Sequence, residues 1–598
     1  MQALTSPIEN RTGLSRVCEV IRVFPMIRPA KLGALIGFLL LATTMAWLMW
    51  QPIHEESATA DEAWILGAGY TYCNGMGFRM HPDEPPLAKM WSALPLMFMP
   101  VQIPEECRSL FEGRTGYHLD RPWRGPFQQS NQLFPAGRDN WYYWPWFEGD
   151  RFGQFFLYGG ENDADRLLTA ARLMQVVLAL LTAALIFLWA NRLGGTLAGL
   201  LGCALWVFNP VALAHGHIVQ TDGGGTLTML ASVWSFTHFA QHPRLRSAVI
   251  AGLAFGLALA TKLSALLLLP TFVVVAALVW WKLEAEQRRT LQFVRLIPVL
   301  AVCTWAIILI VYAPRWTPAP PLEKGQAAWL NVPPWFEELR LILIPPDFFK
   351  AVALLIGTAD AGHNGYLFGE WSPEGWWYYY PVAFALKTPI VFLALTAGAL
   401  IVLLWQIRTR RAEQLVPWIA AAMFFALAMH NKMDIGVRHL LPVYGLLSVA
   451  VASQMAPLRG PSRVATLVLV AWLAVVSICA HPFYIEYFNG FVGGARNGYK
   501  YLLDSNLDWG QDVKRLKKYL AGRNVNHCYV AFSGLEKAIT YYGIQSTTVD
   551  ATEAHNLQQG TLVVPAMLLM RPEWAWLRKE HQPIDRVGYT LFIYRIGD

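Results

Sequence analysis

Residues 32–50 read LGALIGFLLLATTMAWLMW, an apolar run without a single charged side chain. A helix needs about twenty such residues to cross the hydrocarbon core of a bilayer, so the run predicts a membrane span. No cleavable signal peptide is evident before it, and its length indicates that it is retained as a span.

The composition is that of a membrane protein. Of the 598 residues, 55% are hydrophobic and only 15% are charged, and the chain contains 26 Trp. A soluble protein of this size would carry about a quarter charged residues. The net charge of +7 does not indicate a nucleic-acid partner, because most basic residues lie between apolar runs.

Apolar runs recur along the chain and predict about eleven transmembrane helices. They are Leu32–Trp50, Leu167–Trp189, Leu197–Ala214, Gly223–Ala240, Val249–Ala260, Leu263–Trp281, Leu296–Ala313, Tyr379–Trp405, Val416–Met429, Leu440–Ser453 and Ala465–Ala480. Arginines and lysines precede the first run and then fall in alternate short loops, as at Arg192, Lys282 and Arg408. By the positive-inside rule these loops and the N-terminus are cytoplasmic. We therefore expect an α-helical polytopic protein of the inner (plasma) membrane.

The remaining polar segments then share the extracytoplasmic side. They include a first loop over residues 51–166 and a long loop over residues 315–378. We expect residues 1–482 to form the transmembrane domain and residues 483–598 a small extracytoplasmic α/β domain. In the latter, Asp508–Leu520 has a helical pattern, and short strands are predicted at His527–Phe532, Thr561–Val564 and Tyr589–Tyr594.

The first loop concentrates unusual charge. Asp61-Glu62 is followed by His81-Pro-Asp-Glu-Pro-Pro-Leu-Ala-Lys89, and the apolar segment Leu87–Pro100 is too short to span a bilayer. We expect this segment to lie as a helix at the membrane surface. Charged groups this close to a bilayer are costly unless they perform chemistry or pair with one another.

Each charged candidate has two interpretations. Asp61-Glu62 suits a catalytic base and its neighbour, or an acidic helix N-cap. Asp222 could orient a partner residue, or pair with Lys262 in a structural role. The cations near the outer face suit a phosphate group, or the ordinary snorkelling of long side chains to the interface. These cations are Lys89, Lys262, Lys387 and Arg438.

The sequence does not favour a metal cofactor. His215, His217 and His363 occur without an HExxH motif or a cysteine pair, and in Asp504–Gly510 the glycine position of a calcium loop is held by Trp509. Convergence of Asp61, Glu62, Glu84 and Asp222 into an oxygen-rich cage stays open as the contrary interpretation. A disulfide between Cys73 and Cys107 in the first loop is also left open.

The chain resembles polyprenyl-phosphate-sugar-dependent glycosyltransferases of the GT-C fold, the group of family 39 type that includes protein O-mannosyltransferases and aminoarabinose transferases. The resemblance runs in order through nearly the whole chain. It rests on Asp61-Glu62, His81…Pro85-Pro86-Leu87-Ala88-Lys89, Thr221-Asp222, Ala260-Thr-Lys262, Gly362-His-Asn-Gly-Tyr-Leu-Phe-Gly-Glu370, Lys387-Thr-Pro389, Gly436-Val-Arg438, His481-Pro482 and Asp504-Ser-Asn-Leu-Asp-Trp-Gly-Gln-Asp512. Three residues, including Asp83 and Glu84, are inserted relative to the shorter family motif HPPLGK.

The resemblance implies an inverting membrane glycosyltransferase that moves one sugar from a polyprenyl-phosphate carrier to an extracytoplasmic hydroxyl of a protein, lipid or polysaccharide. It implies Asp61 as the base with Glu62 beside it, Asp222 as a second acid, and Lys89 as a ligand of the lipid phosphate. Lys262 and Arg438 are further candidate phosphate ligands, and His81, Glu84, His363 and Lys387 are candidate substrate-binding residues. The alternative is a transporter or flippase of lipid-linked sugars, which would place its ionisable groups near the bilayer midplane.

Overall fold

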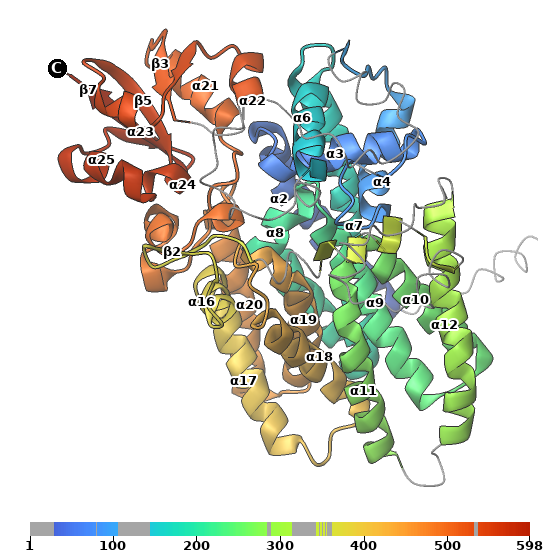
Figure 1. The fold of residues 1–598 in the computed structure, drawn as a ribbon. Coiled ribbons are helices and arrows are strands. Elements are labelled where there is room, and N and C mark those ends of the chain that lie inside the picture. Colours follow the sequence, from blue (N-terminus) through green and yellow to red (C-terminus); the bar gives the residue numbers. More distant parts are fainter. Residues whose placement is uncertain are drawn as a thin grey trace, which may run out of the picture.

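The computed structural model describes residues 29–78, 80–105, 144–283, 289–313, 362–531 and 536–597, together with parts of 343–355. Within these ranges a helical body carries a small C-terminal domain built on a sheet (Figure 1). The predicted fold class, an α-helical membrane protein with a small C-terminal α/β domain, is confirmed. Cys107 and most of the predicted loop 315–378 lie outside the described residues.

Every apolar run named above forms helix. The helices of the body are α2 (Pro29–Glu55), α7 (Ala164–Val207), α8 (Pro210–His217), α9 (Thr221–Gln241), α10 (Leu245–Thr261), η3 (Leu263–Leu267) with α11 (Leu268–Lys282), α12 (Thr290–Tyr312), α16 (Tyr379–Lys387), α17 (Ile390–Gln406), α18 (Ala412–Ala428), α19 (Leu441–Met455) and α20 (Gly460–Ala480). The long helix α7 contains the predicted span Leu167–Trp189 and the first part of Leu197–Ala214, which continues into α8. It is broken at Gly195, whose φ of 79° lies in the region that glycine adopts without steric cost.

Fewer helices than expected are long and apolar enough to cross a membrane alone. Five of the described helices qualify by length and composition, or six if α16 and α17, bent by 112°, count as one span. Other helices, such as α10, are shorter, and α19 is buried along almost its whole length among α7, α9, α17 and α18. The prediction of about eleven spans therefore stays a prediction.

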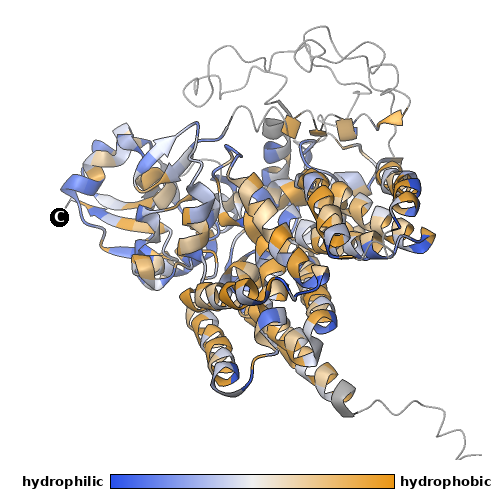
Figure 2. Cartoon of the chain, turned by 90° about the horizontal axis from the view of Figure 1, so that it is seen from below, coloured by the Kyte–Doolittle hydropathy of each residue, from blue (hydrophilic) through white to orange (hydrophobic). Residues whose placement is uncertain are grey.

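The outer faces of the body are apolar. Val302 on α12 is 68% exposed and Trp405 on α17 is 83% exposed, within a longer series of exposed large side chains. Hydrophobic residues prevail along the helices in Figure 2, whereas the C-terminal domain contains more hydrophilic residues. Exposed apolar area on this scale is unfavourable in water and suits contact with lipid.

Three of the basic loops meet at one end of the body. Lys282 Nζ, at the end of α11, donates a hydrogen bond of 3.1 Å to Ile407 O after α17. Arg192, before the break in α7, lies 3.9 Å from Glu413 at the start of α18. These contacts agree with the predicted sharing of one side by alternate loops, and the orientation of that side in a membrane stays a prediction.

The opposite end carries the helices of the first loop, α3 (Ala60–Cys73), α4 (Leu87–Ala93), η1 (Leu94–Phe98) and α6 (Trp144–Tyr158) (Figure 1). The expected surface helix over Leu87–Pro100 is α4 followed by the 3-10 turn η1, with Pro95 near the start of the turn. Proline lacks an N–H donor, which accounts for the end of the α-helix here. Phe98 is 85% exposed, and the location of this segment at the membrane surface stays a prediction.

The C-terminal domain contains a five-stranded sheet of order β4-β3-β5-β7-β6. Its strands are β3 (Cys528–Val530), β4 (Ser546–Thr548), β5 (Gly560–Pro565), β6 (Asp585–Val587) and β7 (Leu591–Ile596), with β3 parallel to β4 and β5 and the other pairs antiparallel. Its helices are α21 (Val513–Gly522), α22 (Glu536–Tyr541), α23 (Ala551–His555), α24 (Ala566–Leu569) and α25 (Ala575–Glu580). The three predicted strands correspond to β3, β5 and β7. The predicted helix begins at Val513 rather than Asp508. Residues 507–512, which follow the 3-10 helix η9 (Asp504–Asn506), pack as irregular chain against the helical body.

Candidate active site

The site begins at the N-terminus of α3. Thr59 caps this helix, and its hydroxyl accepts from Glu62 N while Glu62 Oε2 accepts from Thr59 N at 2.9 Å. This reciprocal capping fixes the first turn and the direction of Asp61. The Asp61 side chain is 31% exposed, whereas Glu62 is fully buried.

Five predicted residues meet in a chain of alternating charge. Asp61 Oδ2 lies 2.8 Å from Arg438 Nη1, which lies 3.9 Å from Asp222 Oδ2. Asp222 Oδ1 lies 2.7 Å from Lys262 Nζ, which lies 3.8 Å from Glu84 Oε1. Residues from α3, the turn η6 (Val437–Leu440), α9, the end of α10 and the loop before α4 thus form one cluster at one end of the helical body.

Backbone features bring Asp222 and Lys262 together. Asp222 occupies the first turn of α9, where a negative side chain interacts favourably with the helix dipole. Lys262 ends α10, and its aliphatic stem crosses Gly225 of α9, where an added Cβ would lie 3.2 Å from the lysine carbons. The glycines after Asp222 therefore permit the close approach of Lys262.

Arg438 is a permanent cation that has a hydrogen-bond donor without a partner among the described residues. Burial alone would lower its pKa, but the nearby carboxylates of Asp61 and Asp222 raise it above its usual value. Its Nη1 reaches Asp61, while its buried Nε has no hydrogen-bond partner among the described residues. A buried donor without a partner is costly, so the Nε group is well placed for a ligand acceptor such as a phosphate oxygen.

Lys89 lies beside this cluster but does not project into it. The side chain is fully buried, and Nζ donates to the carbonyls of His81 and, at 2.8 Å, Glu84. Burial lowers its pKa to about 8, despite the opposing attraction of Asp83 and Glu84. Lys89 thereby fixes the loop that presents Glu84, and its expected role as a direct phosphate ligand stays a prediction.

Lys387 lies apart from the charged chain. Its Nζ donates to Ile485 O and Asn506 O, both at 2.6 Å, and lies 4.4 Å from the ring centroid of Phe488. Because these contacts tie α16 to the segment after α20, the geometry favours a structural role over the expected substrate contact.

The two predicted histidines have different surroundings. His81 Nε2 lies 3.2 Å from Asp83 Oδ1, and burial, together with the charges of Lys89 and Arg438, lowers the His81 pKa well below its usual value. His81 thus contacts a residue of its own loop. His363 N donates to Lys432 O at 3.2 Å, and its buried Nδ1 has no partner among the described residues.

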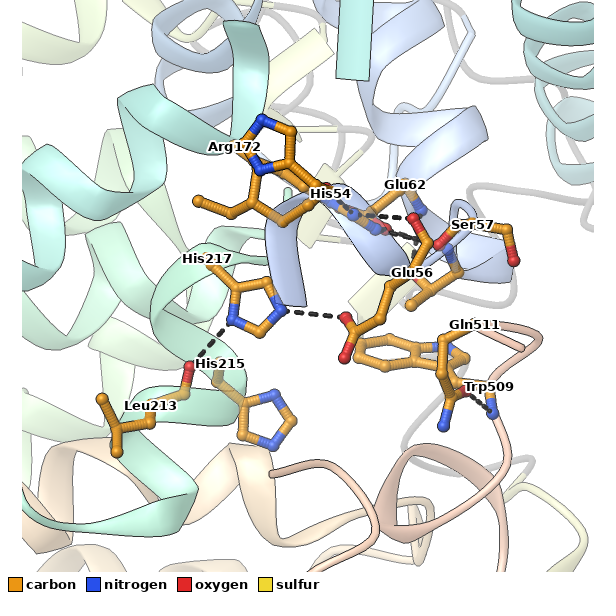
Figure 3. Close-up of polar contacts among 12 residues, drawn as sticks. His54, Glu56, Ser57, Glu62, Arg172, Leu213, His215, His217, Trp509 and Gln511 are labelled. Atoms are coloured by element: carbon orange, nitrogen blue, oxygen red, sulfur yellow. Dashed lines mark hydrogen bonds and ion pairs between the residues drawn. The ribbon is translucent and has the colours of Figure 1, made fainter. Parts of the chain in front are cut away.

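Glu62 forms a buried ion pair with Arg172 (Figure 3). Arg172 of α7 donates to both its oxygens, at 2.8 Å from Nε and 2.7 Å from Nη2, and both side chains are fully buried. Val219 N also donates to Glu62 at 2.9 Å. With its oxygens occupied, Glu62 is placed to hold α3 against α7, and the catalytic role expected beside Asp61 stays a prediction.

Sequence reasoning did not identify three residues at the site. Arg172 sits inside a predicted apolar span, a position that itself signals a buried acidic partner. Trp509 lies with its ring under Arg438, at 4.4 Å from the guanidinium carbon. His439, next to Arg438, lies within electrostatic reach of Lys262 and Asp222. Trp509 stood in the motif Asp504–Asp512 without an assigned role, and no pattern distinguished His439.

No group of three or more His, Cys, Asp or Glu side chains within the described ranges is arranged to hold a metal ion. Asp61, Asp222 and Glu84 each face Arg438 or Lys262 instead. The open interpretation of an oxygen-rich cage requires these carboxylates to leave their cationic partners.

Residues 164–316 match the family of dolichyl-phosphate-mannose-protein mannosyltransferases. The matched segment runs from the start of α7 to just beyond α12 and contains Asp222 and Lys262. Over this segment the match confirms the resemblance predicted from the motifs. A comparison with curated proteins finds no match.

Two solved structures are similar over most of the chain. ArnT from Cupriavidus metallidurans, bound to undecaprenyl phosphate, is 12% identical, with 93% of this chain and 97% of that chain covered and a TM-score of 0.44. The archaeal oligosaccharyltransferase AglB from Archaeoglobus fulgidus, in complex with an inhibitory peptide and a dolichol-phosphate, is 11% identical. Here 92% of this chain and 72% of that chain are covered, with a TM-score of 0.45.

Proposed function

We propose that this protein is a membrane glycosyltransferase that moves a single sugar from a polyprenyl-phosphate carrier to a hydroxyl acceptor on the extracytoplasmic face of the inner membrane. The observation that supports this proposal most directly is the charged cluster, in which a partly exposed Asp61 contacts Arg438 and Arg438 in turn lies near Asp222. The family that matches residues 164–316 is named for transfer from a lipid-phosphate-linked sugar, which supports a donor of this class.

Asp61 is the proposed general base. It is the most exposed carboxylate of the cluster, and the capped start of α3 fixes its direction. A carboxylate in this position can accept the proton of an acceptor hydroxyl while the hydroxyl oxygen attacks the anomeric carbon. Direct attack on the face opposite the leaving phosphate inverts the configuration at that carbon.

Arg438 and Lys262 are the proposed partners of the leaving phosphate. As the sugar–oxygen bond breaks, negative charge grows on the carrier phosphate, and nearby fixed cations stabilise that transition state. Arg438 offers its unpartnered Nε, and Lys262 is only 12% exposed, so little water screens its charge. A carrier with one phosphate leaves with less negative charge than a diphosphate. We therefore propose that Arg438 and Lys262 offset this charge without a metal ion.

The direct test is release of free carrier phosphate by the purified protein. The protein is reconstituted in vesicles and supplied with polyprenyl-phosphate sugars of different kinds, each with protein, lipid and polysaccharide acceptors. Free polyprenyl phosphate together with a glycosylated acceptor is the expected result, and anomeric analysis of the product reports inversion. Intact donor that only changes leaflet would show a flippase and reject the proposal.

A further inference from the structure

The segment Asp504-Ser-Asn-Leu-Asp-Trp-Gly-Gln-Asp512 belongs to the C-terminal part of the sequence but packs against the start of α3. Ala60 N donates to Trp509 O and Ser57 N donates to Gln511 O, both at 2.9 Å. The Ser57 hydroxyl also donates to Gly510 O at 3.0 Å. These bonds fix Ser57 and Ala60, on the stretch that leads into Asp61, to the segment. The position of the proposed base therefore depends on residues far away in the sequence.

The same segment also holds the turn that carries Arg438. Asn506 Oδ1 accepts from Val437 N at 2.9 Å, and the Ser505 hydroxyl donates to Ile435 O at 2.8 Å. Ser505 packs so closely on Gly436 that a Cβ there would lie 2.1 Å from its hydroxyl oxygen. The turn before Arg438 therefore has little freedom to move independently of residues 504–512.

Trp509 contacts Arg438 and the residue that precedes Asp61. Its carbonyl accepts from Ala60 N, the residue before Asp61, while its ring lies 4.4 Å from the Arg438 guanidinium carbon. Trp509 is only 6% exposed, and its backbone N–H donates to Gln511 Oε1 at 2.8 Å (Figure 3). A guanidinium on an indole face is attracted to the ring while its in-plane N–H donors stay free for other partners.

We propose that Trp509 is a positioning residue for the glycosyl transfer, a proposal that rests on the function given above. Its ring fixes the plane of Arg438, so that the unpartnered Nε and the Nη groups face the carrier phosphate. Its backbone holds the start of α3, so that Asp61 keeps its place beside Arg438. The C-terminal part of the chain thereby completes the site instead of serving only as an appended domain.

The test is a double-mutant cycle on the purified full-length protein, with KM for the polyprenyl-phosphate donor and kcat measured separately. Trp509→Leu removes the aromatic face and should raise KM about tenfold, the scale of a desolvated cation–π contact. Trp509→Phe keeps a ring and should restore most of that loss. In an Arg438→Lys background, which lacks the planar guanidinium, Trp509→Leu should add less than about twofold, because residues that act through one another are not additive.

Trp576→Leu is the matched control, since Trp576 stacks on His555 in the C-terminal domain and should leave KM unchanged. Additive effects of Trp509→Leu and Arg438→Lys, or a fall in kcat of Trp509→Leu without a change in KM, would overturn the assignment of Trp509 while the proposed function stands. If Trp509→Leu does not fold, a rise in the KM of Trp509→Phe that adds in full to the rise caused by Arg438→Lys would overturn it as well. A wild-type protein that releases no carrier from any donor overturns both proposals.

Discussion

Asp61 Oδ2 and Arg438 Nη1 lie 2.8 Å apart, although the two residues are separated by 377 positions in the sequence. This contact occupies one oxygen of the proposed base and one donor of the proposed phosphate ligand. We infer that the two functions are linked: a carrier phosphate that binds Arg438 releases an Asp61 oxygen for the acceptor hydroxyl. The base would then become available only when donor is present.

Arg438→Lys should weaken donor binding more than turnover. Lysine keeps the positive charge but lacks the planar fork of N–H donors that can bind two oxygens of a phosphate. We expect KM for the polyprenyl-phosphate sugar to rise by about tenfold or more, on the scale of one charge-assisted hydrogen bond. Arg523→Lys is the control, because Arg523 is 63% exposed in a surface pair with Asp585. Equal KM values for the two variants would contradict the role of Arg438.

Glu62→Gln should impair folding rather than chemistry. The change leaves the buried Arg172 without its counter-charge, a loss of about 3–5 kcal/mol for pairs of this kind. We expect a clearly lower thermal midpoint and lower yield, with the kcat of the folded fraction within a few fold of wild type. Glu413→Gln, in the looser pair with Arg192, should change neither. Normal stability combined with a hundredfold loss of kcat would instead restore Glu62 as a catalytic residue.

Asp508 should make the stability of the protein fall as pH rises toward neutrality. Burial raises its pKa to about 7, against the opposing hydrogen bond from Met567 N, while an unfolded chain has the usual value near 3.8. The folded state therefore binds more protons between these values, and its stability is greatest below the unfolded pKa and declines up to pH 7. Asp508→Asn keeps an acceptor for Met567 N without the charge. The thermal midpoint of Asp508→Asn, relative to that of wild type, should be higher at pH 8 than at pH 5. An equal difference between the two proteins at both pH values would show that the ionisation of Asp508 does not affect stability.

Catalysis should not require a divalent metal. Asp61, Asp222 and Glu84 face Arg438 and Lys262, so the cations that offset the phosphate belong to the chain itself. We expect the rate of carrier release to be unchanged by EDTA and by added magnesium or manganese. Activity abolished by EDTA and restored by manganese would show that the carboxylates form the oxygen-rich cage.

The sequence predicted the helical architecture well because long apolar runs have few alternatives. Helix boundaries depend on local backbone conformation, as at Gly195, where the backbone leaves the helical region of φ/ψ space. The strands β4 and β6 were missed because each has only three residues and little apolar alternation. The late start of α21 was missed for another reason, since residues 504–512 are held by tertiary contacts that no local pattern reveals.

The sequence predicted which residues share the candidate site as far as their side of the membrane determines it. Asp61, Asp222, Lys262 and Arg438 were expected on one face, and the structure brings them together. Lys89 was not separable from them by sequence, because only the fold shows that its ammonium group bonds to carbonyls of its own loop. The arginine in α7 was the overlooked signal, since a charge within an apolar helix requires a buried partner.

The most direct test of the central claim is the rate of carrier release by Asp61→Asn, measured under single-turnover conditions with saturating donor. Asparagine preserves the shape of the side chain but cannot accept the hydroxyl proton, so the rate should fall at least roughly a hundredfold. Donor should still bind, because Arg438 and Lys262 are intact, and binding of polyprenyl phosphate serves as the internal control. Turnover near the wild-type rate in a folded, donor-binding Asp61→Asn protein would contradict the assignment of Asp61 as the base.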